Sequence, residues 1–83
     1  MPKFIAVHTA PFTEEMFKNM AGNKLPEGLK WNHTYCDFES NKFFCEWDAP
    51  DKGHLEKYFN EGGMPFDTVH PVSLFNVEEA DFE

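Results

Sequence analysis

The stretch "KFFCEWDAPD", residues 42–51, joins a strand signal to a helix signal and decides the fold of this chain. Its aromatic side chains favour a half-buried strand over residues 42–48. Pro50 disfavours helical backbone at the residue before it, and the aspartate that follows is a good N-cap. We therefore predict a strand that ends sharply and is followed by a helix over residues 52–60 with one apolar stripe.

Three more strands and one more helix are predicted from the rest of the sequence. Residues 3–9 are rich in β-formers, residues 29–38 alternate between two faces, and residues 68–77 form the last strand. After the first strand, Thr13 is the expected N-cap of a short helix that ends at Gly22. A hairpin turn joins the second strand to the third.

The resulting order, β-α-β-β-α-β, is that of the α+β class with the ferredoxin-like topology. In this fold a four-stranded antiparallel sheet carries two helices on one face, and residues 1–83 form a single such domain. Right-handed crossovers place the first and third strands side by side in the centre. The second strand then lies beside the third, and the fourth lies beside the first.

The other face of this sheet has no helix to cover it. The alternation along the strands places Ile5, Val7 and Phe44 on that open face, which is more apolar surface than a monomer leaves in water. We therefore expect a homodimer through this face, or a small apolar ligand bound there.

The charge of the chain excludes two classes of partner. Seven basic and fifteen acidic residues give a net charge of −8, which repels nucleic-acid phosphates and anionic membranes and attracts cations. No apolar run approaches the roughly 20 residues that span a bilayer, and no signal peptide opens the sequence. Two cysteines are too few for a secreted disulfide framework. We expect a cytoplasmic protein with both thiols reduced.

Four side chains with metal-ligand chemistry are predicted to meet at one end of the sheet. We expect the first and third strands to run in the same direction and the second and fourth to run opposite, so the topology brings together His8, His33, Cys45 and His70. A left-handed Asn41 in the hairpin gives a register in which His33 and Cys45 share one side of the sheet. Imidazole and thiolate suit Ni(II), Cu(II), Zn(II) or Fe(II). The sequence thus predicts a divalent transition-metal site formed by these residues.

Packing is the competing interpretation of these residues. Cys45 stands among aromatic residues, where a free cysteine commonly serves as a small core hydrophobe. His70 precedes a proline and can be satisfied by a local hydrogen bond, and His54 in the second helix is expected to lie on the surface. No local ligand motif such as CxxC or HExxH is present. Both interpretations of Cys45 stay open on sequence grounds.

Four blocks of the sequence, "MPKFIAVHT", "LKWNHTY", "FFCEWDAPD" and "GGMPFDTVHPV", resemble a family of small bacterial ferredoxin-like proteins, some described as nickel-binding. The most specific block is Phe44-Cys45 followed by Ala49-Pro50, with His8 closing the first strand. The resemblance implies a dimeric α+β fold of the α/β-barrel type and metal binding through His8 and Cys45, with nickel as the suspected metal. Some relatives carry paired histidines on the second helix, where this chain reads "KYFNEGG".

Two classes of function follow from these observations. The first is a non-enzymatic binder of a transition-metal ion. The second is a small dimeric α/β-barrel enzyme, of the kind that includes cofactor-free monooxygenases and isomerases, in which an aromatic pocket holds an apolar substrate. In that case His8 or His33 moves a proton. The sequence alone leaves open whether the protein is an enzyme.

Overall fold

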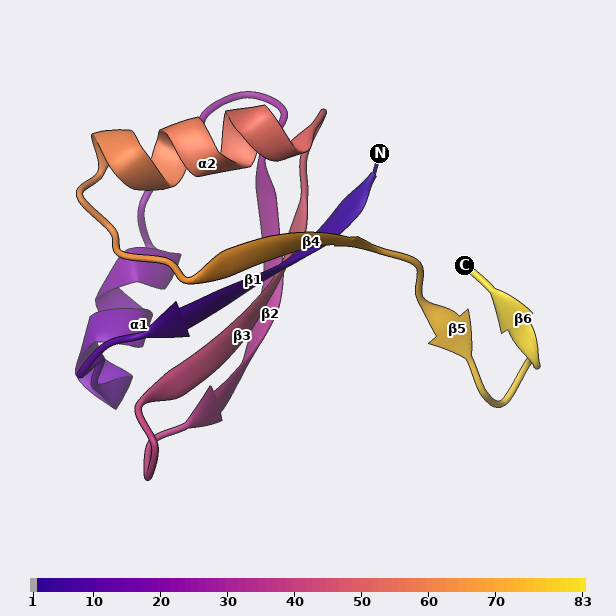
Figure 1. Cartoon of the computed structure of the whole chain (residues 1–83), viewed down its shortest axis with the longest axis horizontal. Helices are drawn as coiled ribbons and strands as arrows, with labels where there is room; N and C mark the ends of the chain where they lie inside the picture. The colour runs from indigo at the N-terminus through magenta and orange to yellow at the C-terminus, as the bar shows by residue number, and fades with distance from the viewer. Residues whose placement is uncertain (1) are drawn as a thin grey trace.

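The computed structural model describes residues 2–83 and has an α+β ferredoxin-like fold (Figure 1). Its elements are β1 (Lys3–Thr9), α1 (Glu14–Ala21), β2 (Lys30–Asp37), β3 (Lys42–Asp48), α2 (Lys52–Glu61) and β4 (Thr68–Val72), followed by the short strands β5 (Phe75–Asn76) and β6 (Asp81–Phe82). The predicted order of the first six elements is confirmed. The strand predicted over residues 42–48 has the bounds of β3.

Local signals set the ends of both helices. The Thr13 side chain accepts a hydrogen bond from the backbone N–H of Met16 at 3.2 Å, and Gly22 is the C-cap of α1. Asp51 accepts from the backbone N–H of His54 at 2.8 Å at the start of α2. Caps of this kind each stabilise a helix by about 1 kcal/mol. The predicted N-caps and the predicted end of α1 are therefore confirmed.

The four main strands form one sheet in the order β2-β3-β1-β4, so the predicted neighbours are confirmed. The predicted common direction of the first and third strands is wrong, because β1 and β3 are antiparallel, from Lys3 opposite Asp48 to Thr9 opposite Lys42. The hairpin makes β3 run opposite to β2, and β3 also pairs antiparallel with β1. The end of β1 therefore meets the start of β3.

The register of the β2–β3 hairpin also differs from the prediction. Asn41 has the expected left-handed backbone, with φ 54°, but Asp37 rather than Phe38 lies opposite Lys42. Four residues, 38–41, thus form the loop. A shift of one residue turns every side chain of a strand to the other face of the sheet. A register shift between Trp31 and His33 adds a bulge at the other end of β2.

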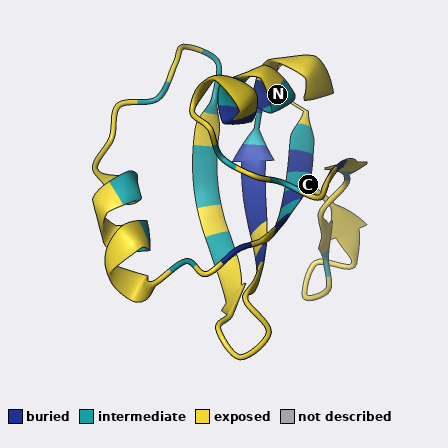
Figure 2. Cartoon of the chain, turned by 60° about the vertical axis from the view of Figure 1, so that its left-hand side comes forward, coloured by how far each residue is buried: buried dark blue, intermediate teal, exposed yellow. Residues whose placement is uncertain are grey.

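The core lies between the sheet and α2. It consists of Phe4, Ala6, Cys45, Trp47, Ala49, Leu55, Phe59 and Val69. In Figure 2 the buried positions lie mainly on the strands and on α2, whereas α1 shows only half-buried and exposed residues. Helix α1 contacts the rest of the molecule through Phe17, whose ring lies 5.1 Å from that of Phe43. One side of the helical layer is therefore packed less tightly than the other.

The last predicted strand, over residues 68–77, is shorter in the structure. Strand β4 ends at Val72, which lies opposite Lys3, the first residue of β1, so β1 offers no further partner. The chain then leaves the sheet, and β5 and β6 form a separate hairpin that projects from the main body (Figure 1). Within residues 2–83, no helix is both long enough and apolar enough to cross a bilayer.

Replacing Phe59 by alanine tests the packing of this core. Phe59 is fully buried, and its ring packs against those of Trp47 and Phe66. We expect Phe59→Ala to lower the free energy of unfolding by about 3 to 5 kcal/mol, because it removes a large ring from a packed site. Urea unfolding followed by circular dichroism measures this loss.

Phe75→Ala is the matched control, since Phe75 is 47% exposed and lies in the projecting hairpin. It packs edge-on against Phe82 and is half exposed, so we expect a loss of about 1 kcal/mol or less. Similar losses for the two variants would contradict the assignment of the core.

Candidate functional site

The structure divides the four predicted metal ligands between the two faces of the sheet. His8 and Cys45 lie on the face that carries the helices, which we call the helix face: Cys45 is opposite Ala6, and His8 follows Ala6 by two residues. His33 and His70 lie on the open face. The prediction that all four gather at one place is therefore wrong.

The cause is the register of the two edge strands. With the observed hairpin register, His33 is opposite Glu46, one residue away from the predicted partner Trp47, so its side chain turns to the open face. On the other edge, His70 is opposite Ile5, whereas the next residue, Pro71, is opposite Phe4. The face on which an edge-strand side chain lies depends on which residue of the neighbouring strand it is paired with. The spacing of histidines in the sequence does not reveal this pairing.

A pocket of about 480 Å³ lies on the helix face, between the sheet, α1 and α2. Aromatic rings form much of its wall: Phe12, Phe17, Trp31, Trp47 and Tyr58. His8, Cys45 and Glu61 also line it. Two of the four predicted site residues thus share one cavity, and its volume lies in the range typical of small-molecule sites.

His8 has one ring nitrogen engaged and one free. Its Nδ1 lies 2.8 Å from the backbone carbonyl oxygen of Pro65, and a carbonyl only accepts hydrogen bonds, so Nδ1 carries the proton. The other nitrogen, Nε2, is buried and has no hydrogen-bond partner among residues 2–83. His8 is 1% exposed, and this desolvation lowers its pKa despite the Pro65 carbonyl and the charge of Asp67, which act the other way. Nε2 therefore offers an unprotonated lone pair at neutral pH.

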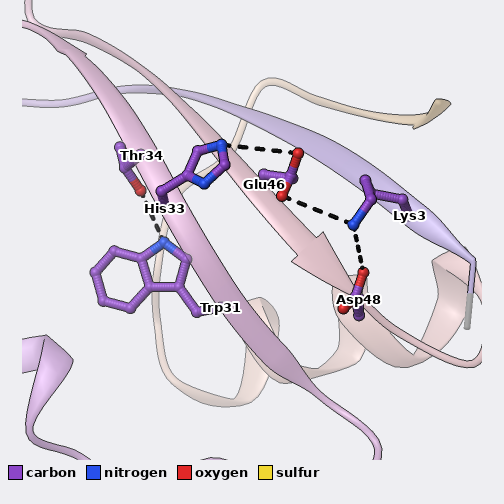
Figure 3. A network of polar contacts seen from close by, with 6 residues as sticks. All are labelled: Lys3, Trp31, His33, Thr34, Glu46 and Asp48. Carbon is purple, nitrogen blue, oxygen red and sulfur yellow. Dashed lines mark hydrogen bonds and ion pairs between the residues drawn. The ribbon is translucent and has the colours of Figure 1, made fainter. Parts of the chain in front are cut away.

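Cys45 is a buried, protonated thiol. Desolvation raises its pKa to about 11, and the hydrogen bond that the Thr34 hydroxyl donates to Sγ at 3.1 Å offsets only part of this effect. Thr34 in turn accepts a hydrogen bond from Trp31 Nε1 at 2.7 Å (Figure 3). Cys45 therefore belongs to the core, as the packing interpretation predicts. It can serve as a thiolate ligand only if a cation displaces its proton.

The open face carries an ionic network instead (Figure 3). Glu46 is 7% exposed, and its two carboxylate oxygens lie 3.7 Å from His33 Nε2 and 3.8 Å from Lys3 Nζ. Lys3 also donates a hydrogen bond to Asp48 at 3.0 Å, which raises the pKa of Lys3. A lysine ammonium thus already occupies the place beside Glu46 that a metal ion would need.

The remaining histidines have local partners. His70 lies across the sheet from His33, in the row formed by His33, Glu46, Ile5 and His70, and its Nε2 is 2.9 Å from the Thr68 hydroxyl. His54 lies on the surface, as predicted, with Nδ1 at 2.8 Å from Asp51. Within the described part of the chain, no group of three or more His, Cys, Asp and Glu side chains is arranged to hold a metal ion. Ligation by His8, His33, Cys45 and His70 stays a prediction.

Sequence reasoning missed two features of the pocket. Trp47 Nε1 is buried in its wall and, like His8 Nε2, has no hydrogen-bond partner among the described residues. Glu61 reaches the pocket from the last turn of α2. One sequence signal could have found Glu61: the spacing of apolar residues on α2 predicts that this helix packs on the sheet, and Glu61 lies near the edge of the packed stripe. No local sequence signal indicates that the indole N–H of Trp47 is buried without a hydrogen-bond partner.

Residues 4–72 match the family described as nickel responsive protein SCO4226-like. The chain belongs to this family. The match spans β1 to β4 and includes every residue of the pocket, whereas the β5–β6 hairpin lies outside it. No curated protein and no solved structure matches the chain significantly. The nickel-responsive family thus confirms the resemblance found in the sequence.

The buried imidazole predicts a loss of stability in mild acid. The pKa of His8 in the folded protein lies below its ordinary value of 6.5, so the unfolded chain binds more protons below that pH. The contribution of His8 is therefore fully present above pH 6.5 and decreases as the pH falls toward the folded-state pKa. We expect the urea midpoint to fall between pH 7.5 and pH 5.5 by less in His8→Gln than in the wild type. Phe75→Ala, in the projecting hairpin, removes no titratable group and is the control that should keep the wild-type slope.

Proposed function

We propose that the protein binds a divalent transition-metal ion, in particular Ni(II), in the pocket on the helix face, with His8 Nε2 as the first ligand. One observation supports this site above the others: Nε2 is buried, unprotonated and without a partner, while Nδ1–H is held by the Pro65 carbonyl. Metal-binding histidines in proteins commonly have this arrangement, because the second hydrogen bond fixes the ring and its tautomer. Membership of a nickel-responsive family supports the choice of metal.

The other donors of the pocket suit the same ion. Imidazole nitrogen and thiolate sulfur are both ligands for Ni(II). Glu61, which also lines the pocket, is mostly exposed and already pairs with Lys57 at 3.8 Å. Cys45 contributes only after losing its proton, so metal binding releases a proton and weakens in acid. Cys36 and Cys45 are both unpaired, and a reducing compartment such as the cytoplasm keeps the thiol of Cys45 available.

The protein is proposed to act as a homodimer. Phe44 is 37% exposed and Tyr35 66% exposed on the open face, where they lie side by side on β3 and β2, next to Val7 on β1. A second copy placed on this face would bury these side chains together. In such a dimer, two rows containing His33 and His70 approach each other and double the number of imidazoles at the interface.

An enzyme is the alternative function, and the size of the pocket is the observation that favours it. A cavity of about 480 Å³ with aromatic walls holds an apolar substrate as well as an ion. His8 Nε2 would then accept a proton from that substrate, as in a monooxygenase or isomerase without a cofactor.

Titration with nickel chloride tests the proposed metal site. We expect the wild-type protein to bind Ni(II) in isothermal titration calorimetry and to gain melting temperature, because a ligand of the native state stabilises it. His8→Ala should weaken binding by about 10-fold or more. Cys45→Ser should retain binding but lose any sulfur-to-nickel charge-transfer absorption.

His54→Ala removes an exposed imidazole that does not line the pocket and is expected to bind like the wild type. Circular dichroism of His8→Ala checks that the fold is intact. Undiminished binding by folded His8→Ala, or loss of binding on His33→Ala instead, would show that the metal does not bind at the pocket.

Light scattering after size-exclusion chromatography tests the dimer. We expect twice the mass of one chain for the wild type and the mass of a single chain for Phe44→Glu, because the new charge would be buried without a partner. Phe75→Glu, in the projecting hairpin, is the control and should remain dimeric. A wild-type protein that is monomeric at high micromolar concentration would rule this assembly out.

A further inference from the structure

We propose that the pocket on the helix face also binds a small organic cation, namely a quaternary ammonium group carried on an apolar molecule. The inference goes beyond metal binding and does not depend on it. It rests on three properties of the pocket: a continuous aromatic wall, a lining without basic side chains, and the negative ends of both helices at its border.

The aromatic wall consists of rings that contact one another in sequence. The ring centroid of Trp31 lies 6.3 Å from that of Phe17 and 6.0 Å from that of Trp47. Trp47 in turn lies 5.7 Å from Tyr58. Phe17, Trp31 and Tyr58 are only half-buried, so they offer surface to a ligand. Aromatic rings attract an ammonium ion placed over their faces, and sites made of several rings are typical of quaternary ammonium recognition.

The charges of the lining favour a cation. Among residues 2–83, no lysine or arginine lines the pocket, and Glu61 is the single carboxylate that does. His8 adds no positive charge at neutral pH, because burial lowers its pKa. The chain as a whole carries a net charge of −8. A cation therefore meets no repulsion from the wall, whereas a carboxylate or phosphate is opposed.

Both helices end at the pocket. Met20 in the last turn of α1 and Asn23 just beyond it line the cavity, as do Glu61 and Gly62 at the end of α2. The C-terminal end of a helix carries a partial negative charge that stabilises a nearby cation. Glu61 pairs with Lys57 at 3.8 Å, but both side chains are more than two-thirds exposed. Surface pairs of this kind are weak, so a bound cation can replace Lys57.

The apolar part of the lining selects a methylated ammonium group over a primary amine. Phe12, Leu25 and Met64 add carbon and thioether surface to the rings. A primary ammonium carries three N–H donors, and leaving them without acceptors in such a site is unfavourable. A quaternary ammonium has no N–H, and its methyl groups pack against apolar side chains. The cavity of about 480 Å³ has room for such a group together with an aromatic ring.

The test compares two compounds of the same shape on full-length protein freed of metal by dialysis against a chelator. (3-Hydroxyphenyl)trimethylammonium is the probe, and in 3-tert-butylphenol a carbon replaces the charged nitrogen. A merely apolar pocket prefers the neutral compound, because more hydrophobic surface leaves water. We expect ligand-observed NMR titration at pH 7 and low salt to show about 5-fold tighter binding of the cation.

Variants of Tyr58 test the contribution of the aromatic wall. Tyr58→Leu keeps an apolar side chain but removes the ring, and it should weaken the cation about 5-fold while changing 3-tert-butylphenol much less. Tyr58→Phe keeps the ring and is the matched control, so it should retain the wild-type preference. Circular dichroism checks that both variants are folded.

Variants of two glutamates on α2 test the contribution of charge. Glu61→Gln removes the carboxylate at the pocket and should weaken the cation about 2-fold at low salt without affecting 3-tert-butylphenol. Glu56→Gln makes the same change in net charge on the same helix, at a residue that does not line the pocket, and should bind like the wild type.

Equal affinities of the two compounds, or tighter binding of 3-tert-butylphenol, would overturn the proposal, as would undetectable binding of the cation at millimolar concentration. So would equal losses of both compounds in Tyr58→Leu, or equal effects of Glu61→Gln and Glu56→Gln. If Tyr58→Leu does not fold, the glutamate pair decides. These outcomes leave the nickel site unaffected, since the protein is metal-free throughout. Conversely, a protein that binds the cation but no nickel supports the organic site and refutes the metal site.

Discussion

The antiparallel register between β1 and β3 is the constraint on which the rest of the structure depends. These two strands are the centre of the sheet, and seven residue pairs, from Lys3 opposite Asp48 to Thr9 opposite Lys42, fix their alignment. The alignment turns Ala6 and Cys45 toward the helices. Shifting one strand by a residue would turn Cys45 outward and bring the charged Glu46 into the core. The hydrophobic pattern therefore specifies this register strongly.

The same register creates the site. It buries His8 at the end of β1, where the backbone before Asp67 passes close enough for the Pro65 carbonyl to accept a hydrogen bond from Nδ1–H. The opposite wall of the pocket is different in character, because none of the residues Glu14–Ala21 of α1 is buried. Segments with few buried contacts open at low free-energy cost. The pocket thus combines a rigid floor, formed by the sheet and α2, with a wall that can adjust to a ligand.

Features encoded by neighbouring residues could be predicted from the sequence. The bounds of β3, the N-caps Thr13 and Asp51 and the order of the strands in the sheet are of this kind. Each depends on a residue type at a fixed offset or on the handedness of a crossover, and needs no distant partner.

The face on which each histidine lies could not be predicted in the same way. Asn41 was correctly assigned a left-handed backbone, yet the loop closes one residue earlier in β2 than expected, and that single step moves His33 to the other face. The tautomer of His8 is set by a carbonyl 57 residues away in sequence, and the isolation of Trp47 Nε1 depends on all its neighbours at once. These properties belong to the packed structure and have no local sequence signal.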